Sequence, residues 1–406
     1  MRRMRARRAL AAVVVVLLAC TADPAVEGDP AEQQSAATAP DSPAAADLRL
    51  RLEQHFGLFA AAVVATLVQP EDPAKAAQAM VTATLDDLSA TIAEAYDQPT
   101  AEEFTAIAGR YPGALAEYAE AVGGPELLSS GAAPTAERLA VLRVPTQLAT
   151  FMSTVTGGEM EEEGTAALLR APTMSLLKVA GARVTDDYET AYAQQREAYA
   201  AMISVGSAFA AGISEQMPEQ YPGLRNSGAV ELRSALQQLL GEHSLLAAGV
   251  TRRALRGTRD FEAAAAALNG NTEDLTGALD SIYSGSDSEF DVQWRARISL
   301  LADHAVAVAR DRAKAVREAR AALAATDRRI AMQLVQLSDD TIESVPLTQA
   351  LRALTGALLE QTTRSAAKTF AEADESAVAA HEAAADLAAL IAQGIAAHRP
   401  SEFPAQ

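Results

Sequence analysis

The chain has 406 residues and a formal net charge of −19, because 53 acidic side chains outweigh 34 lysine and arginine side chains. A charge of this sign argues against nucleic acid and against an anionic lipid surface as direct partners. The only cysteine is Cys20, so a disulfide within the chain and a site with several cysteine ligands are both excluded.

The N-terminal segment has the pattern of a bacterial lipoprotein signal peptide. Arginines are concentrated in residues 1–8, and an apolar run over residues 9–19 follows them. This run is too short to cross a bilayer as a stable helix but has the length of a signal-peptide core. It ends in Leu17-Leu18-Ala19-Cys20, which resembles the lipobox. We therefore expect residues 1–19 to be removed and the protein to be exported and lipid-anchored through Cys20 at the outer face of the cell membrane. The alternative is an ordinary signal peptide with an incidental cysteine.

Residues 20–46 are predicted to form a disordered tether. They consist largely of Ala, Pro, Ser and acidic residues, with almost no large apolar side chain. Such a segment cannot offset the entropy of ordering by burying apolar surface. The membrane contact is therefore expected to be made through the N-terminal lipid alone.

Residues 47–223 are predicted to form a first helical unit. Its opening apolar stripe consists of Leu48, Leu52, His55, Phe59 and Ala62. Thr100 with Glu103 has the pattern of a capping box, which marks the start of the third helix, and Pro112 and Pro145 are expected to kink or break their helices. Further helices are expected over residues 134–158, 164–182 and 185–217.

Residues 229–403 are predicted to form a second helical unit. Its first stripe consists of Leu232, Leu236, Leu239, His243, Leu246 and Val250, and its third of Phe290, Trp294, Arg297, Leu301, His304 and Val308. The steps of three and four residues are those of helices in an antiparallel bundle. Asp260 is a candidate N-cap for the second helix. Later helices are expected over residues 311–337, 346–369 and 373–398.

The second unit repeats the plan of the first. His55 corresponds to His243, Phe104 to Phe290 and Pro218 to Pro400, at offsets of 188, 186 and 182 residues. A period of this length indicates a domain duplication rather than a solenoid repeat. The sequence therefore predicts an all-α fold of two tandem antiparallel helical bundles.

One polar layer is predicted inside each bundle. In an antiparallel hairpin, residues equidistant from the turn lie at one level, and the turns expected near residues 258 and 285 place Asp274 and Arg297 level with His243. Glu242, next to His243, extends this layer. The same construction in the first unit joins His55, Asp86 or Asp87, and Tyr111.

Two interpretations of this layer compete. Bundle cores hold metal ions with His and carboxylate side chains from facing helices, which would make His243 and Asp274 metal ligands. Alternatively, Asp274 pairs with Arg297 and orients His243 in a satisfied polar layer. Arg297 favours the second interpretation, because a guanidinium has no lone pair to donate and would place a positive charge against the cation.

Four segments of the chain form a recognisable pattern: Leu240-Gly241-Glu242-His243, Asp260-Phe261-Glu262-Ala263-Ala264, Asn271-Thr272-Glu273-Asp274-Leu275-Thr276 with Trp294, and Arg196-Glu197-Ala198-Tyr199-Ala200 leading to Gln216-Met217-Pro218. In these segments the chain resembles a family of duplicated, secreted helical proteins of Gram-positive bacteria, most of which have no functional name. The resemblance implies a duplicated helical fold and hints at metal binding. Family members carry histidines where this chain has Arg297 and near Ala201 and Ala383, so this chain departs from the family at those positions.

No catalytic motif accompanies this architecture: the sequence has no Gly-rich phosphate loop, no HExxH and no nucleophile-elbow serine. We therefore expect a non-catalytic, lipid-anchored helical protein of the cell envelope with a binding or scaffolding role. The alternative is a metal-binding or metal-sensing lipoprotein that uses Glu242, His243 and Asp274, with His55 and Asp87 as the equivalents in the first unit. The sequence does not identify a protein partner.

Overall fold

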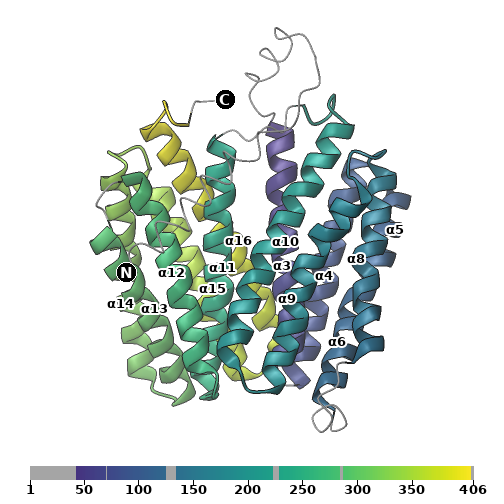
Figure 1. The fold of residues 1–406 in the computed structure, drawn as a ribbon. Coiled ribbons are helices and arrows are strands. Elements are labelled where there is room, and N and C mark those ends of the chain that lie inside the picture. The colour runs from purple at the N-terminus through teal and green to yellow at the C-terminus, as the bar shows by residue number, and fades with distance from the viewer. Residues whose placement is uncertain (1–42, 70, 125–133, 223–227, 284–286, 404–406) are drawn as a thin grey trace, which may run out of the picture.

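The computed structural model describes residues 43–69, 71–124, 134–222, 228–283 and 287–403. All regular secondary structure in these ranges is helical, which confirms the predicted all-α class (Figure 1). None of the helices in these ranges combines the length and the apolar character needed to cross a membrane. The predicted signal peptide, Cys20 and most of the predicted tether lie outside the described residues.

The helices lie side by side along one axis. In the first half (residues 43–222) they are α3 (Pro43–Val68), α4 (Glu71–Ala95), α5 (Gln98–Ala108), α6 (Arg110–Gly123), α8 (Thr135–Val155), α9 (Glu162–Val184) and α10 (Tyr188–Gln216). In the second half (residues 228–403) they are α11 (Gly228–Arg256), α12 (Phe261–Tyr283), α13 (Asp287–Ala309), α14 (Ala313–Leu337), α15 (Ser344–Ala367) and α16 (Phe370–His398). Three helices were predicted for the later part of each unit. They agree with α8–α10 and α14–α16 to within three residues at each end.

The helix starts differ from prediction in the first half. Helix α3 begins at Pro43, inside the segment expected to be tether, and Ala45 is fully buried. The capping box predicted at Thr100 and Glu103 is wrong, because Asp97 caps α5 by accepting a hydrogen bond from the backbone N–H of Thr100 at 2.9 Å. An aspartate at the N-cap satisfies an N–H group that has no partner within the helix, so the helix starts three residues earlier.

Prolines act differently at the two predicted positions. The helix that was expected to continue past residue 104 is divided into α5 and α6 at Gly109, three residues before Pro112. Proline cannot donate to the carbonyl four residues earlier and its ring crowds that carbonyl, which accounts for a break at this point. Pro145, in contrast, lies inside α8 and is buried there.

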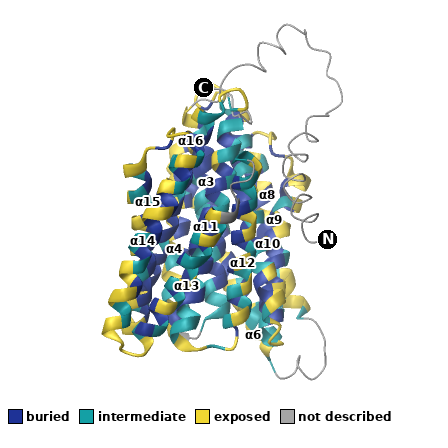
Figure 2. Cartoon of the chain, turned by 90° about the vertical axis from the view of Figure 1, so that its left-hand side faces the viewer, coloured by how far each residue is buried: buried dark blue, intermediate teal, exposed yellow. Residues whose placement is uncertain are grey.

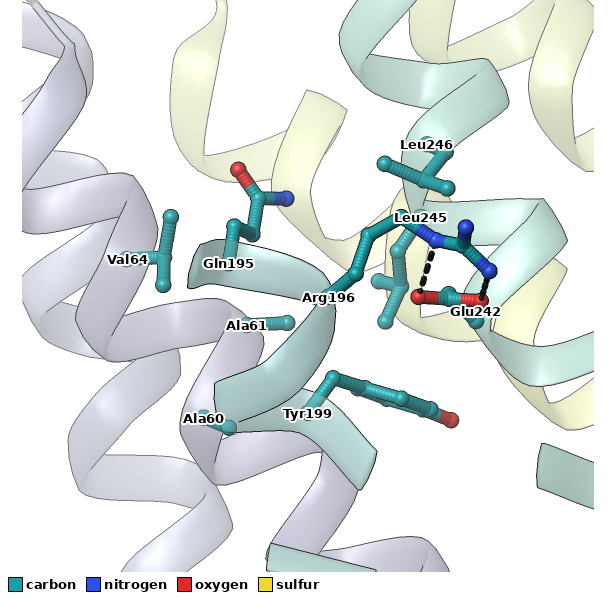
Figure 3. Close-up of a pocket in the computed structure, with 9 residues that line it drawn as sticks. All are labelled: Ala60, Ala61, Val64, Gln195, Arg196, Tyr199, Glu242, Leu245 and Leu246. Carbon is teal, nitrogen blue, oxygen red and sulfur yellow. Dashed lines mark hydrogen bonds and ion pairs between the residues drawn. The ribbon is translucent and has the colours of Figure 1, made fainter. Parts of the chain in front are cut away.

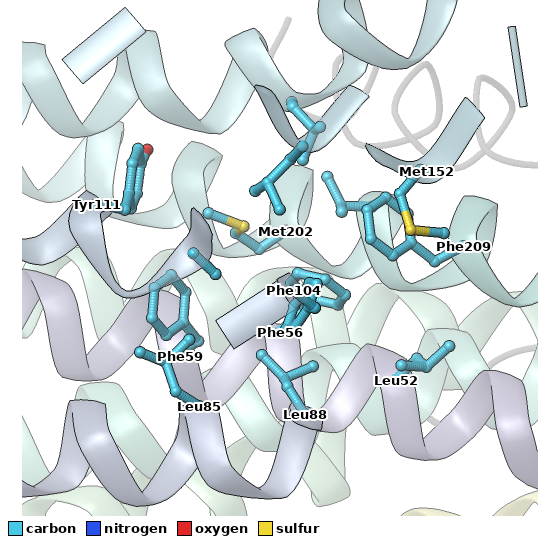
Figure 4. Packing of buried hydrophobic residues seen from close by; sticks show 14 of the residues in the cluster. Leu52, Phe56, Phe59, Leu85, Leu88, Phe104, Tyr111, Met152, Met202 and Phe209 are labelled. Atoms are coloured by element: carbon cyan, nitrogen blue, oxygen red, sulfur yellow. The ribbon is translucent and has the colours of Figure 1, made fainter. Parts of the chain in front are cut away.

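Apolar side chains form two cores, one in each half. Residues between Ala45 and Tyr221 make the first core, in which Phe56 meets Phe209 edge-on with ring centroids 5.2 Å apart (Figure 4). The second core gathers residues from Leu236 to Ile395, together with Tyr192 of α10. Exposed residues lie mainly at the ends and on the outer faces of the molecule, while buried residues line the interior of the helix array (Figure 2).

Helices α3, α10, α11 and α16 lie at the centre, where the two halves meet. Helix α3 packs on α10 within the first half and α11 packs on α16 within the second; α3 also contacts α11. Across the same boundary, α16 packs on α4 and α10 packs on α12. The buried carboxylate of Glu53 accepts a hydrogen bond from Ser234 at 2.7 Å, and Gln237 donates to the carbonyl of Leu50 at 2.9 Å. Polar groups therefore join the halves in addition to apolar contacts.

Local structure recurs at positions 182 residues apart. The hydroxyl of Thr156 accepts from the backbone N–H of Met160 at 3.1 Å, and Ser338 accepts from that of Ile342 at 3.2 Å. A Cβ atom added to Gly212 would meet the side chain of Met160, and one added to Gly394 would meet that of Ile342. The segments 156–160 and 338–342 thus each pack one large apolar side chain against a glycine of the last helix in their half.

Candidate functional site

His243 lies in the middle of α11 and is fully buried. Its Nδ1 lies 3.1 Å from Oδ1 of Asn271 on α12, and the Asn271 amide group donates to the carbonyl of Leu239 and to Glu242. Since the Asn271 nitrogen is committed to these acceptors, its oxygen faces His243, and the indole N–H of Trp294 approaches the same Nδ1 at 3.4 Å. Nε2 of His243 has no hydrogen-bond partner among the described residues. Burial, with a contribution from the charge of Arg297, lowers the pKa of His243 to about 3, so the ring is neutral.

Glu242 connects this histidine to a salt bridge between the two halves (Figure 3). Arg196 of α10 donates to both carboxylate oxygens of Glu242, each at 2.9 Å. The same guanidinium donates to Asp274 at 2.8 Å, and the Asp274 side chain is 50% exposed. Asp274 therefore lies at the outer edge of the polar layer. It does not orient His243, as had been predicted, and Asn271, one helical turn earlier, takes that place.

Arg297 is fully buried, as the predicted polar layer requires, but the predicted pairing with Asp274 is wrong. Its Nε lies 3.3 Å from Oδ1 of Asp327 on α14, and its Nη2 donates to the hydroxyl of Thr355 on α15 at 3.1 Å. The guanidinium also lies over the Trp294 ring, 5.2 Å from its centroid. Burial lowers the pKa of Arg297 and raises that of Asp327. A signal for Asp327 was present in the sequence, because this carboxylate interrupts the apolar stripe of Leu323, Ile330 and Leu334.

The polar layer predicted for the first half does not assemble. His55 is half-buried, with its Nδ1 3.4 Å from the Thr91 hydroxyl, and Asp86 and Asp87 are exposed. Burial lowers the pKa of His55, although the nearby charge of Asp87 opposes this shift. Tyr111 is buried elsewhere and donates to the hydroxyl of Thr173 at 2.8 Å.

At equivalent positions of the two halves, different side chains occupy the interior. Tyr111 and Thr173 stand 186 and 182 residues before Arg297 and Thr355, and each pair is hydrogen-bonded. The position 182 residues before Asp327 is Pro145, which cannot pair with a charged group. The buried ion pair is therefore a feature of the second half.

The described residues contain no group of three or more His, Cys, Asp or Glu side chains that could hold a metal ion. His243 and Asp274, the predicted metal ligands, have separate partners: His243 is bonded to Asn271, and Asp274 to Arg196. The polar layer thus consists of a hydrogen-bond network that runs from His243 through Asn271 and Glu242 to Arg196, and of a separate group formed by Arg297, Asp327 and Thr355.

A second polar site, which the sequence analysis missed, lies where the ends of several helices meet. It is a cavity of about 470 Å³ between the end of α3, the end of α9, the end of α11 and the start of α12. We call it the arginine cavity, because its lining includes Arg183, Arg252, Arg253, Arg256 and Arg259. Among the lining side chains that the structure describes, Asp260 is the only carboxylate.

Asp260 binds two of these arginines. Its Oδ2 lies 2.7 Å from Nη1 of Arg183 and 2.7 Å from Nε of Arg253, and it also accepts from the Tyr192 hydroxyl at 3.2 Å. Burial alone would raise the pKa of Asp260, but the two guanidinium groups outweigh it and hold the pKa well below its ordinary value. Asp260 directly precedes α12, as predicted for an N-cap, but its carboxylate binds the arginines of the cavity.

The other arginines are less well neutralised. Arg252 donates from Nη2 to Asp374 at 2.7 Å, but its Nε has no hydrogen-bond partner among the described residues. Arg256 and Arg259 form no ion pair with any described carboxylate, and Arg256 lies over the Phe370 ring, 5.5 Å from its centroid. Burial and the charges of Arg252 and Arg253 lower the pKa of Arg256. The cavity therefore holds a surplus of positive charge within an acidic protein.

Comparison with known proteins adds nothing to this geometry: no family model, no curated protein and no solved structure matches the chain. The resemblance to duplicated helical proteins of Gram-positive bacteria therefore stays a prediction.

Proposed function

We propose that this protein is a non-catalytic binding protein of the cell envelope and that it binds an anionic ligand in the arginine cavity. One observation carries the proposal: five guanidinium groups surround a cavity of about 470 Å³, and the described part of its lining contains a single carboxylate. Arginine is the side chain best suited to recognise carboxylate and phosphate groups, because its planar fork of N–H donors matches two of their oxygens.

Solubility does not account for this cluster. The chain as a whole is acidic, with a net charge of −19, so additional positive charge is not needed to keep the protein apart from its copies. Like charges in a partly enclosed space repel each other: burial lowers the pKa of Arg256, and the charges of Arg252 and Arg253 lower it further. A bound anion would relieve it, so binding is expected to stabilise the folded protein.

We further propose that the two halves arose by duplication, as tandem copies of one bundle. The matched contacts of Met160 with Gly212 and of Ile342 with Gly394 support this, since both residues of each pair are shifted by 182 positions. Tyr199 and His381, also 182 residues apart, meet at the centre, with 3.0 Å between the Tyr199 hydroxyl and Nε2 of His381. On this proposal the arginine cavity lies between the copies, because α3 and α9 line it from one half and α11 and α12 from the other.

The proposed lipid anchor at Cys20 is compatible with an accessible cavity. The chain enters α3 at Pro43, whereas the cavity is lined by Leu67 and Val68 at the other end of that helix. At 1.5 Å per residue, α3 separates these two points by roughly 35–40 Å. The tether would therefore leave the molecule at the end opposite the cavity, and its attachment would not cover the cavity.

Calorimetric titration with inorganic phosphate at constant ionic strength tests the proposal. We expect wild-type protein to bind phosphate and the double variant Arg256→Gln/Arg259→Gln to bind it at least about tenfold more weakly, since two of the five positive charges around the anion are removed. Arg317→Gln is the matched control, because Arg317 is exposed on α14 and outside the cavity lining; its affinity should stay within about twofold of wild type. Equal phosphate affinity in the wild type and the double variant would refute the assignment of the cavity. Failure of the wild type to bind phosphate, sulfate and citrate would refute anion binding altogether.

A further inference from the structure

The arginine cavity continues into a second, apolar space. A recess of about 70 Å³ lies between α3, α10, α11 and α16 and shares Val68, Gln69, Arg252 and Arg253 with the arginine cavity. We call it the apolar recess. Its aliphatic lining includes Ala61, Val64 and Ala65 from α3 and Leu245, Leu246 and Ala248 from α11. Figure 3 draws a neighbouring pocket that shares these side chains, and it shows Ala61 and Val64 on one side and Leu245 and Leu246 on the other.

The size of the apolar recess fits a short aliphatic chain. A single water molecule needs roughly 10–15 Å³ by the same measure of volume, so 70 Å³ accommodates a group of about five heavy atoms. The polar side chains of the lining are Gln69, Tyr192, Gln195, Arg252, Arg253 and Asp374. An alkyl group placed against the aliphatic part of the wall gains affinity because apolar surface leaves water. The recess is too small for a long acyl chain.

Arg252 links the two spaces. It lines both the arginine cavity and the apolar recess, and its Nε–H donor has no partner among the described residues. Arg253, which also lines both, is held in place by Asp260. An anionic head at these two guanidinium groups would have its substituent directed either to the solvent side or into the recess.

We infer that the ligand of the arginine cavity is a short-chain aliphatic anion, whose head binds at Arg252 and Arg253 and whose alkyl chain occupies the apolar recess. This inference rests on the proposed anion-binding function. The head can be a carboxylate or a phosphate monoester, because a guanidinium pairs with either.

A chain-length series tests the inference. Acetate, butyrate, hexanoate, octanoate and decanoate are titrated into the protein at constant ionic strength, with butyl phosphate as the second type of head and inorganic phosphate as the anion without a chain. Affinity is expected to rise about fourfold for each added methylene up to about hexanoate, as apolar surface leaves water, and to level off beyond it. Comparison of butyrate with butyl phosphate identifies the preferred head.

A variant that fills the recess provides an independent measurement. Ala65 is only partly exposed and lines the recess, so Ala65→Leu should place its added carbons there. The variant is expected to retain phosphate binding within about threefold and to lose the dependence on chain length. Ala278→Leu is the control, since Ala278 on α12 is similarly half-buried and lies outside the recess lining.

Each result has a distinct meaning. If phosphate binds and all carboxylates bind as weakly as acetate, the recess is not used and the inference fails while anion binding stands. Affinity that still rises steeply from octanoate to decanoate would refute a short chain. If neither phosphate nor any carboxylate binds, the proposed function fails as well. The wild-type series decides the matter even if Ala65→Leu does not fold.

Discussion

Arg297 and Asp327 form an ion pair with almost no contact with water, at side-chain exposures of 0% and 1%. The guanidinium has Thr355 and the Trp294 ring as further partners, whereas Oδ2 of Asp327 has no hydrogen-bond partner among the described residues. Removing two charges from water costs several kcal/mol each, and a single Coulombic contact offsets that cost only in part. The pair is therefore costly to break and is not required by the helix arrangement, since the first half fills the equivalent level with Tyr111 and Pro145.

Replacing one member of this pair should destabilise the protein more than replacing both. We expect Asp327→Ala to lower the free energy of unfolding by about 3–5 kcal/mol, because it strands the buried cation. The double variant Arg297→Met/Asp327→Leu should unfold within about 1 kcal/mol of wild type or be more stable. Urea denaturation measures both. As a control, Arg295→Ala on the same helix removes a half-exposed pair with Asp291 and should cost less than about 1 kcal/mol. A single and a double variant of equal stability would contradict this account.

The buried histidines make stability depend on pH above the range in which carboxylates titrate. Burial lowers the pKa of His243 and of His381 to about 3 from the value of 6.5 expected in the unfolded chain. Between these values the unfolded state binds protons that the folded state does not, so stability falls as the pH drops below about 6.5. Each histidine should contribute a slope approaching about 1.4 kcal/mol per pH unit.

Urea denaturation of wild type at pH 7, 6 and 5 is the measurement. His243→Gln and His381→Gln should each have a shallower loss of stability over this range than wild type, whatever their stability at pH 7. A slope unchanged in both variants would show that these side chains are protonated in the folded protein.

At the scale of the element, helices α3 and α10 approach so closely that one position admits only glycine. A Cβ atom built on Gly206 would lie 2.6 Å from the backbone nitrogen of Glu53 and 2.7 Å from its Cα. Both atoms belong to the backbone of the neighbouring helix, so no side-chain rotation can relieve the contact. The same approach lets Glu53 bind Ser207 on α10 and Ser234 on α11.

Gly206→Ala should therefore destabilise the protein even though alanine favours helices. We expect a loss of about 1–3 kcal/mol, typical of a core forced apart. Gly356→Ala is the matched control: it lies within α15 with nothing within 4 Å of an added Cβ, so it should stabilise by up to about 1 kcal/mol. Thermal or urea unfolding of the two variants provides the comparison, and equal effects would mean that α3 and α10 can separate at no cost.

The helices were predictable because their apolar stripes are long and regular, and those over residues 313–337 and 370–398 have no competing signal. The residues that make up the polar layer were harder to predict. Counting residues from a turn assumes ideal hairpins, and an error of one turn exchanged Asn271 for Asp274. The construction also used three helices, while the partner of Arg297 is Asp327 on a fourth. The burial of His243 and Arg297 could be predicted because both lie within apolar stripes. Their hydrogen-bond partners could not, because they depend on how the helices pack against one another.

At the scale of the whole molecule, the arginine cavity could not be predicted because its parts are distant in sequence. Leu67 and Val68 end α3, Arg183 lies at the end of α9, and Arg252 and Arg253 lie near the end of α11. A run of arginines near residues 252–259 is visible in the sequence, but by itself it indicates only a solvated charged face. The surplus of charge becomes a site only where the first and second halves meet, and their mutual arrangement is set by helix packing.

That meeting of the halves predicts one cooperative unfolding transition. Ser234 of the second half binds the buried Glu53 of the first, and Arg49 of the first half lies 2.6 Å from Glu231 of the second. Separation of the halves would break both of these contacts. Trp294, the only tryptophan, belongs to the second core, so its fluorescence reports on that half, whereas far-ultraviolet circular dichroism reports on both. We expect the two signals to have the same urea midpoint.

A substitution in the first core makes this test stringent. Phe56 is buried against Phe209 in the first half, and Phe56→Ala should cost about 3–5 kcal/mol through the cavity it leaves. If the halves unfold together, the tryptophan midpoint of this variant falls by the same amount as the circular dichroism midpoint, although Trp294 lies in the other core. A tryptophan transition that stays at the wild-type midpoint would mean that the second half folds independently. The arginine cavity, which needs both halves, would then be lost before the second core unfolds, and phosphate would no longer shift the tryptophan transition.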